Sequence, residues 1–577
     1  MPVSSVRIIS SSTQSASDTE SSKWAEVWRS VVPFALVFLA ACTLFFINLG
    51  NFPLFNPDEA LYAEPAREML EIGDYITTYL NYVVRFTKPP VAIWGQALSI
   101  LAFGCNEFAV RFFGAAAGAL LVAATYCFAE KFAGRRAAIA SSMMLCTAPL
   151  FIGTAREAIT DMPLSFFSAS SMFLFYTSLQ TQSKRMLWLA YALTGLAVMT
   201  KGPVGLVLPV AILGVFHFLR QDIKSALRFY SPLVGLSIVG IIAVPWFAVE
   251  IWITKGAYFN EFIMGENVQR FTSVVDSHKG GWWYHIAAVM GGFFPWSIFI
   301  PQSLLGAIPW QKLRQFWKDS GPLSILRAFQ NMSPTDNLSL FCICWTVVTV
   351  GFFSVSVSKL LPYTLPAFPA IALLIALEFE RIIESQLARR AVIPAFILFA
   401  IFAGTSVILP HAVMKLRDAP ETLVEMGSSF ASYEVIFTML CVALLSRRFF
   451  RAGFFLFLLP TFMGILFFGG RILTVLSQTW EEPLPAMARY AGSSDLPILV
   501  FDMRKPSMPF YTGRKVIQPG SREALIAFLK SPEGAKGAYI LTKSKQNDFF
   551  RAQEGCKLQY SQGKFVLVRY VPNSPES

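Results

Sequence analysis

The chain has 577 residues, of which 54% are hydrophobic and only 15% are charged, and its mean hydropathy is +0.52. A soluble protein of this composition would aggregate, so the composition predicts a polytopic α-helical membrane protein. The net charge of +12 does not indicate a nucleic-acid partner, because the basic residues punctuate the apolar runs and form no single patch. The eight cysteines mostly lie in or beside apolar runs, which indicates buried small side chains rather than a disulfide framework.

The first predicted element is an N-terminal tail, residues 1–30. Its first 22 residues are rich in Ser and Thr, and Lys23 and Arg29 precede a long apolar run without a convincing small-residue cleavage site. We therefore expect a disordered cytoplasmic tail over 1–30, followed by a retained signal anchor.

A transmembrane domain is predicted over residues 31–475. Its apolar runs are close to the ~20 residues that cross a ~30 Å hydrocarbon layer, and they predict about thirteen membrane helices. The predicted spans are 31–48, 109–130, 136–152, 163–180, 187–199, 203–219, 232–252, 286–306, 339–356, 361–378, 391–410, 433–446 and 451–469.

The shorter apolar segment 90–103 decides which side of the membrane each later loop faces. If it does not cross, every loop rich in Lys and Arg shares the side of Lys23 and Arg29, as the positive-inside rule demands. We therefore predict that 90–103 lies at or dips into the interface. Three loops are then on the outer side, namely 49–108, 153–162 and 253–285.

The first outer loop contains the acidic stretch NPDEALYAEPAREML at residues 56–70. One explanation of this stretch is local helix chemistry. Asn56 is a favourable N-cap residue, Pro57 is favoured at the first helical position, and Glu59 can complete a capping box. The alternative is that Asp58 and Glu59 belong to a functional site. On the residues alone, both explanations stay open.

The other outer loops add further polar residues. Loop 153–162 has an acidic motif that ends in Asp161, for which capping of the next helix is the alternative to a site role. In loop 253–285, His278 and His285 are seven residues apart and are the candidate ligands of a divalent metal. No His-Cys spacing of a closed zinc site accompanies them, interfacial hydrogen bonding is the alternative, and we assign no definite cofactor.

From about residue 476 the sequence changes character. LPILVFDM, GAYILTKS and GKFVLVRY have the pattern of strands, and SREALIAFLK that of a helix that begins at a Ser cap. We predict a soluble α/β domain over 476–577, on the outer side of the membrane.

The outer loops also carry a resemblance to a known family. Asp58-Glu59 after the first span, followed by EPAREMLEIGDYITTYLN and RFTKPPVAIW, resemble the first outer loop of the bacterial aminoarabinose (4-amino-4-deoxy-L-arabinose) transferase family. That family lies within the dolichyl-phosphate-mannose protein mannosyltransferase-like group, which has the GT-C fold. AREAITDMP, MTKGPVGLVLP, NEFIMGENVQRF and SKLLPYTLPAFPAIALL follow in the expected order.

The resemblance implies a glycosyltransferase of the bacterial inner membrane with its active site on the periplasmic side. Its donor is expected to be a sugar on a polyprenyl phosphate, such as undecaprenyl phosphate, and its acceptor lipid A or another glycan or protein, with inversion at the anomeric carbon. A protein O-mannosyltransferase-like enzyme and a secondary transporter or lipid flippase stay open as alternatives. Transporters, however, usually concentrate their charges near the bilayer midplane, whereas here the charges lie at span ends and in outer loops.

By the same resemblance, Asp58 is the leading catalytic carboxylate, and Glu59 and Asp161 complete an acidic pocket. Arg67 and Arg156 are expected to keep these carboxylates ionised, because a nearby cation lowers their pKa.

The phosphate of the lipid donor needs fixed positive charge, because negative charge develops on its oxygens as the sugar leaves. The residues expected to bind it are Lys88, Lys201, Arg270, Lys359 and Tyr363, together with Arg67 and Arg156. For the cations the alternative is that they extend to the head groups of membrane lipids.

Overall fold

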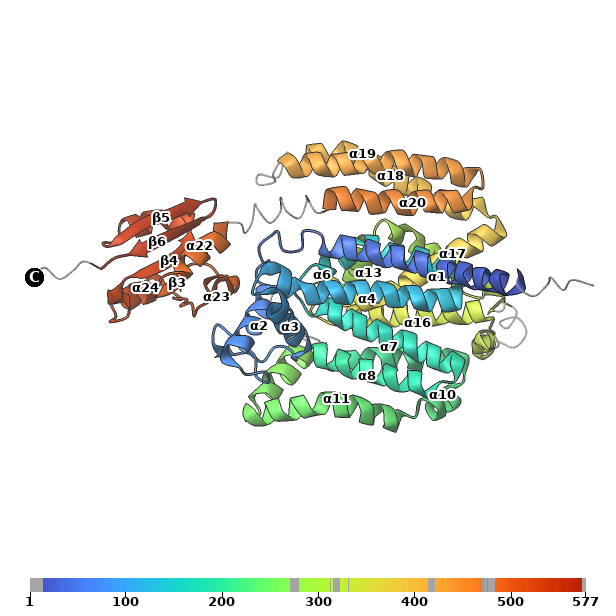
Figure 1. Ribbon diagram of the computed structural model, residues 1–577, viewed down its shortest axis with the longest axis horizontal. Helices are drawn as coiled ribbons and strands as arrows, with labels where there is room; N and C mark the ends of the chain where they lie inside the picture. Colours follow the sequence, from blue (N-terminus) through green and yellow to red (C-terminus); the bar gives the residue numbers. More distant parts are fainter. Residues whose placement is uncertain are drawn as a thin grey trace, which may run out of the picture.

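The computed structural model describes residues 14–269, 280–311, 313–314, 322–330, 332–413, 421–469, 471, 475 and 483–572. The chain forms a bundle of long helices, with a smaller part of strands and short helices at one end of it (Figure 1). We call residues 483–572 the C-terminal part.

The bundle places a helix, or two consecutive helical segments, at each of the predicted spans. Its helices are α1 (Gln14–Phe46), α4 (Glu107–Ala133), α5 (Arg135–Thr147), α6 (Pro149–Ala155), α7 (Asp161–Thr181), α8 (Lys184–Lys201), α9 (Val204–Arg220), α10 (Ile223–Tyr230), α11 (Pro232–Ile253), α13 (Tyr284–Gly292), α14 (Ile300–Ala307), α16 (Pro334–Val355), α17 (Phe368–Ser385), α18 (Ala388–Val413), α19 (Glu421–Ser446) and α20 (Phe450–Gly464). Short 3-10 and π-helical segments lie at η1 (Phe259–Gln269), η2 (Trp296–Phe299), η3 (Pro322–Phe329), η4 (Leu361–Ala367) and η5 (Ile465–Gly469).

The length of these helices supports a multi-pass membrane protein. Among the described residues, seven helices are long and apolar enough to cross a membrane, or up to nine if each of two bent pairs is one span. A helical multi-pass architecture is therefore confirmed, whereas the figure of about thirteen crossings stays a prediction.

α1 begins at Gln14, inside the tail expected to be disordered, because residues 14–29 include Ala, Glu and Lys, which favour helix.

Two sharp bends interrupt the bundle. α5 and α6 meet at 67°, and α13 meets the segment that ends in α14 at 116°. A proline stands at each break, with Pro149 opening α6 and Pro295 just before η2, and proline cannot donate the backbone hydrogen bond that would continue the helix. The bend before α6 leads the chain into residues 156–160, which lie within the predicted second outer loop, 153–162.

The predicted first outer loop folds into α2 (Ala60–Ile72), a short hairpin of β1 (Tyr79–Leu80) and β2 (Val83–Val84), and α3 (Val91–Phe103). With 13 residues, α3 is about 20 Å long, shorter than the ~30 Å of a hydrocarbon core. α2 and α3 lie at the end of the bundle nearest the C-terminal part (Figure 1). The non-crossing position of the segment 90–103 stays a prediction.

The C-terminal part contains a four-stranded sheet in the order β3-β4-β6-β5. β3 and β4 are parallel, and the other pairs are antiparallel. Its elements are α22 (Pro483–Gly492), β3 (Ile498–Val500), α23 (Ser507–Thr512), α24 (Arg522–Leu529), η6 (Gly534–Lys536), β4 (Ala538–Lys543), η7 (Ser544–Gln546), α25 (Asn547–Arg551), β5 (Cys556–Gln562) and β6 (Phe565–Tyr570).

The C-terminal part packs directly on the first outer loop. The two share one hydrophobic cluster, and the Leu54 N–H donates to the Tyr511 hydroxyl at 2.7 Å. The Asn56 amide bonds the side chain and the N–H of Ser507, at 2.8 and 3.0 Å. The predicted cap is therefore wrong: α2 begins at Ala60, and Asn56 is used for this distant contact instead.

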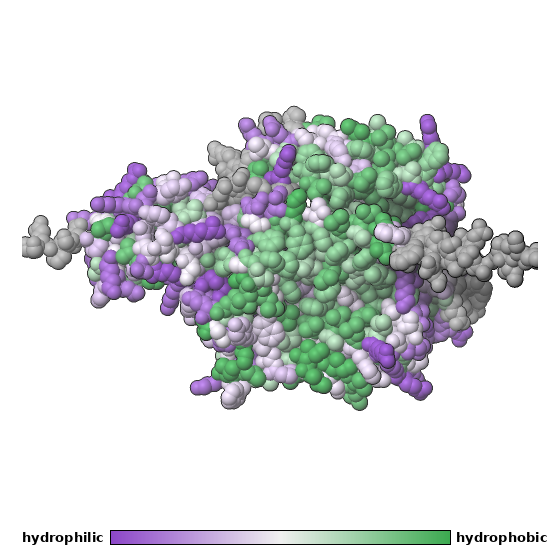
Figure 2. Space-filling model, viewed as in Figure 1, coloured by the Kyte–Doolittle hydropathy of each residue, from purple (hydrophilic) through white to green (hydrophobic). Residues whose placement is uncertain are grey.

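The surface of the bundle is strongly polarised. Figure 2 shows a broad apolar face over the helices, with hydrophilic side chains gathered over the C-terminal part and again at the opposite end. The first turns of α1, together with α10, lie at that opposite end (Figure 1). The acidic outer-loop motifs and the predicted basic loops are thus separated along the bundle axis.

Candidate active site

Asp58 is exposed at the end of the bundle, directly before a fully buried carboxylate, Glu59. Both oxygens of Glu59 are used: Arg111 of α4 donates to them at 2.7 and 2.6 Å, and the N–H groups of Ala158 and Phe55 each donate at 2.9 Å. Arg111 is also fully buried, and it donates to carbonyls of the segment before Asp58. This ion pair joins α4 and the 156–160 loop to the chain that carries Asp58.

Four carboxyl groups share this region. Burial, followed by the negative charges of Glu59, Asp58 and Asp161, raises the pKa of Glu157 to about 8. Glu157 therefore carries a proton near neutral pH, because burial first and the neighbouring negative charges second disfavour its ionised form. The structure thus brings together the two acidic motifs that are about 100 residues apart in the sequence.

The Asp161 carboxylate accepts from Lys201 at 2.5 Å, and only 13% and 14% of their side chains are exposed. Asp161 opens α7 but makes no capping bond, and Thr160 in the N-cap position makes none either. Lys201 ends α8, where Gly202, at a φ of +86°, turns the chain in a conformation that favours glycine. The Lys201 ammonium also lies 4.6 Å from the centre of the Tyr363 ring.

Tyr62 links α2 to this ion pair. Burial raises its pKa, and the charges of Arg85, Lys201 and Asp161 act on its hydroxyl. The guanidinium of Arg85 lies 5.4 Å from the Tyr62 ring and donates to the Leu61 carbonyl. Sequence reasoning missed Tyr62 as a site residue, although it lies only four positions after Asp58.

Lys88 pairs with Glu266 of η1 at 2.5 Å, and both side chains are largely buried. Val91, just after Lys88, and Met199, just before Lys201, belong to one hydrophobic cluster with Trp246 of α11. Lys88 and Lys201 are therefore anchored on the same packed region. Arg270 and His278 lie outside the described residues.

Two further predicted residues lie next to each other and point inward. Lys359 is buried and donates to the carbonyls of Phe353 and Ser354 at 3.2 and 2.6 Å. His285 is fully buried, and its ring is 6.2 Å from Tyr363. Within the described ranges no three His, Cys, Asp or Glu side chains form a group that could hold a metal ion.

The arginines expected beside the catalytic acids have other main partners. Arg67 bonds Glu64 at 2.7 Å and Glu71 at 2.5 Å on its own helix, and Arg156 donates to the Leu44 carbonyl at 2.8 Å. Arg67 and Arg156 were expected to keep Asp58, Glu59 and Asp161 ionised; at Glu59 the cation that does so is Arg111, and for the other two acids the expectation stays a prediction. The sequence signal for Arg111 was its position inside the predicted span 109–130, because a charged side chain within a span needs a partner.

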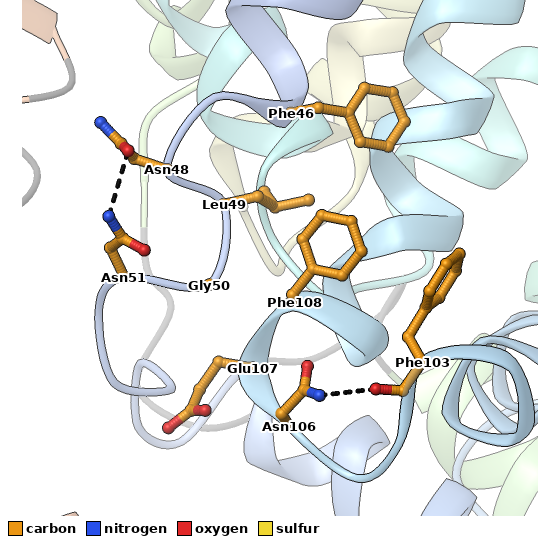
Figure 3. A pocket seen from close by; sticks show the side chains of 9 residues that line it. All are labelled: Phe46, Asn48, Leu49, Gly50, Asn51, Phe103, Asn106, Glu107 and Phe108. Carbon is orange, nitrogen blue, oxygen red and sulfur yellow. Dashed lines mark hydrogen bonds between the residues drawn. The ribbon is translucent and has the colours of Figure 1, made fainter.

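An open pocket of about 520 Å³ lies beside this region, between the end of α1 and the start of α4 (Figure 3). Its polar groups are satisfied locally: Asn51 donates to Asn48 at 3.1 Å, Asn106 to the Phe103 carbonyl at 2.8 Å, and Glu107 accepts from Arg489 at 2.9 Å. We therefore do not include it in the candidate active site.

Comparisons with known proteins concern the family and the fold of the chain. The family described as dolichyl-phosphate-mannose-protein mannosyltransferase matches residues 30–255. The undecaprenyl phosphate-alpha-4-amino-4-deoxy-L-arabinose arabinosyl transferase of Erwinia tasmaniensis is 30% identical over 67% of this chain and 67% of its own length. The protein of the same name from Pectobacterium atrosepticum is 26% identical over 90% of both chains. The crystal structure of ArnT from Cupriavidus metallidurans, bound to undecaprenyl phosphate, superposes on 95% of this chain and 100% of its own with a TM-score of 0.74 at 22% identity.

The helical bundle has the GT-C fold of integral-membrane glycosyltransferases. The resemblance of the outer-loop motifs is thereby confirmed. The chain belongs to the family of undecaprenyl phosphate-4-amino-4-deoxy-L-arabinose arabinosyl transferases.

Proposed function

We propose that this protein transfers 4-amino-4-deoxy-L-arabinose from undecaprenyl phosphate to lipid A at the periplasmic face of the bacterial inner membrane. The names of its relatives support the donor. The observation that carries the proposal is the convergence of the Asp58, Glu157 and Asp161 carboxyls with the Lys201–Asp161 pair at one end of the bundle.

The proposed organisation follows the same reasoning. Residues 1–30 are a cytoplasmic tail, residues 31–475 a transmembrane domain of about thirteen helices, and residues 476–577 a periplasmic α/β domain. The charge polarity of the bundle supports this orientation through the positive-inside rule.

In the proposed reaction, a phosphate oxygen of lipid A attacks the anomeric carbon of the sugar, and the bond from that carbon to the donor's phosphate oxygen breaks. The electron pair of the broken bond stays on undecaprenyl phosphate, whose negative charge Lys88, Lys201, Arg270 and Lys359 stabilise. A single displacement inverts the anomeric configuration.

The acids have distinct proposed roles. A phosphate nucleophile is already ionised, so Asp58 orients the donor through its amino group or hydroxyls. Protonated Glu157 and the Tyr62 hydroxyl donate hydrogen bonds to the sugar in this proposal, since both carry a proton at neutral pH. Glu59 is a positioning residue, because its bonds to Arg111 and Ala158 hold the segment next to Asp58.

Replacement of Asp58 tests the proposal. We expect Asp58→Asn to lower sugar transfer by about 100-fold or more, the usual effect of losing a positioned catalytic carboxylate. The full chain is expressed in membranes, and modified lipid A and remaining polyprenyl-linked sugar are measured by mass spectrometry.

Glu71→Gln is the matched control, since Glu71 is an exposed acid at the far end of α2. Unchanged lipid A modification in Asp58→Asn at normal protein levels would contradict the role of Asp58. If sugar appears on periplasmic proteins instead of lipid A, the acceptor is a protein hydroxyl and Asp58 is its general base, as the matching mannosyltransferase family suggests.

A further inference from the structure

The C-terminal part has a pocket of its own, with a volume of about 440 Å³ and a lining that comes wholly from residues 500–546. Three stretches of chain form it, namely the residues directly after β3, the residues that lead into α24, and Gln546 shortly after β4. A pocket of this size takes a small organic molecule and is larger than a single ion requires.

The pocket lies at the carboxyl ends of parallel strands. β3 pairs in parallel with β4 on one side. On its other side the Val500 N–H donates to the Ile517 carbonyl at 2.9 Å, within a parallel bridge. Ile517 follows β3 in the chain and precedes β4, so the order across the sheet is second, first, third, and the direction of the winding reverses at β3.

Helices cover both faces of the sheet at this reversal. Met508 of α23 shares a hydrophobic cluster with Val500, whereas Leu525 of α24 shares another with Leu499. Because successive residues of a strand point to opposite faces, α23 and α24 lie on opposite faces of β3. Doubly wound α/β sheets bind their ligands in the crevice beyond the carboxyl ends of the strands at such a reversal. The pocket occupies this place in the fold.

Two arginines of the lining, Arg504 and Arg522, make the pocket attractive to an anion. Among the described residues neither of them forms an ion pair with an acid. Asp502, the acid of the lining, has its own cation, because Lys545 lies 2.8 Å from its Oδ2. The charge of the arginines is therefore left for a ligand, and a guanidinium can bind two oxygens of a phosphate at once.

The side chains around the arginines are held in place. Gln546 is only 8% exposed; its amide donates to Oδ2 of Asp502 at 2.8 Å and accepts from Arg522 at 2.9 Å. Oδ1 of Asp502 accepts no hydrogen bond from the described residues. Lys545 and Gln546 lower the pKa of Asp502, so this carboxylate is ionised at neutral pH and can accept from hydroxyl groups.

We propose that this pocket binds a phosphorylated sugar, with Arg504 and Arg522 on the phosphate and Asp502 on the hydroxyl groups. A ligand with both an anionic group and hydroxyls uses the two arginines and the free carboxylate oxygen together, whereas phosphate alone uses only the arginines. The site is a carbohydrate-binding function of the C-terminal part and goes beyond the proposed transfer reaction.

Soluble probes test the site by titration calorimetry on the purified full-length protein. The probes are glucose 1-phosphate, glucose and inorganic phosphate. We expect glucose 1-phosphate to bind more tightly than either of the other two. Arg504→Gln and Arg522→Gln should each weaken its binding by about tenfold or more, as the loss of a charge-assisted hydrogen bond does. Lys530→Gln, an exposed cation at the other end of α24, is the matched control and should change nothing.

A further variant narrows the pocket and keeps both arginines. Gly520 lines the pocket, and a Cβ there meets no atom within 4 Å, so Gly520→Leu adds a side chain without a backbone clash. It should weaken binding of glucose 1-phosphate while the melting temperature stays that of the wild type. Arg504→Gln gives the same safeguard, because Arg504 is exposed and its loss breaks no ion pair among the described residues.

Binding of glucose 1-phosphate that survives the two arginine variants and Gly520→Leu overturns the inference. Inorganic phosphate that binds as tightly as glucose 1-phosphate also overturns it, because the sugar would then contribute nothing. Competition identifies the source of the ligand. Diphosphoryl lipid A that displaces glucose 1-phosphate from the wild type supports the head group of a glycolipid, and its failure to do so supports a free sugar phosphate. Sugar transfer by the wild-type protein decides the proposed function independently of these binding data.

Discussion

At the scale of single residues, the buried Glu59–Arg111 pair fixes the Asp58 segment to the bundle. Both side chains are fully buried, and Arg111 lies 3.8 Å from the centre of the Phe52 ring. Such a pair is costly to break, because removal of one partner leaves the other charged without compensation.

We therefore expect Arg111→Gln to destabilise the protein by about 3 to 5 kcal/mol, measured as a large fall in the melting temperature of the purified full-length chain. The control is Arg489→Gln, whose 59%-exposed side chain pairs with Glu107 and should matter by about 1 kcal/mol or less. Similar falls in melting temperature in both variants would show that the buried pair stabilises the protein no more than the exposed pair does.

The raised pKa of Glu157 predicts that the stability of the protein depends on pH. Its carboxyl has a pKa of about 8 in the folded protein against an ordinary 4.5, so the folded state keeps a proton that the unfolded chain has lost. The contribution of this carboxyl to the free energy of unfolding therefore falls as pH rises from about 4.5 to 8, by an amount on the order of a few kcal/mol. Glu157→Gln should flatten that part of the profile and raise the melting temperature at pH 8 relative to the wild type. A profile with the same slope in both proteins would contradict the shifted pKa.

At the scale of elements, the C-terminal part holds the first outer loop through two asparagines. Besides the Asn56–Ser507 contact, the Asn81 side chain bonds the N–H and C=O of Val516 at 2.8 and 2.7 Å, as a strand would. Asn56 is two residues from Asp58, so this docking positions the candidate catalytic acid.

We expect Asn56→Ala and Asn81→Ala together to loosen the docking by about 1 to 3 kcal/mol, since each asparagine makes two hydrogen bonds of modest net value. Faster amide hydrogen exchange in α2, together with reduced sugar transfer, would show that the docking is loosened. Asn51→Ala, which removes only the exposed contact to Asn48, is the control. Unaltered exchange in α2 would mean that the hydrophobic cluster alone holds the two parts together.

Sequence patterns located the helices, because hydrophobic runs are local, and they singled out 90–103 by its length. They failed where the decisive partner is distant. The capping motif around Asn56 was convincing on its own, yet Asn56 bonds a residue 451 positions away. Likewise Glu59 pairs with Arg111, 52 positions along the chain. Asp161 and Lys201 were both expected in the site through the family resemblance, but their direct contact follows from the packing of α7 against α8.

At the scale of the whole molecule, the first turns of α1 and the C-terminal part lie at opposite ends of the bundle (Figure 1). An odd number of crossings, such as the predicted thirteen, puts them on opposite sides of a membrane. We expect alkaline phosphatase fused after the C-terminal part to be active in cells and the same enzyme fused before α1 to be inactive. Equal activity of both fusions would show an even number of crossings and reverse the assignment of the outer loops.

Arg156 and Glu157 are adjacent in the chain, yet their surroundings differ. Arg156 lines an apolar cavity of about 290 Å³ together with residues of α18, α19 and η5, whereas Glu157 feels the charges of Glu59, Asp58 and Asp161. The short loop after α6 therefore forms the boundary between an apolar space and the acid cluster, and a change in its backbone would alter both at once.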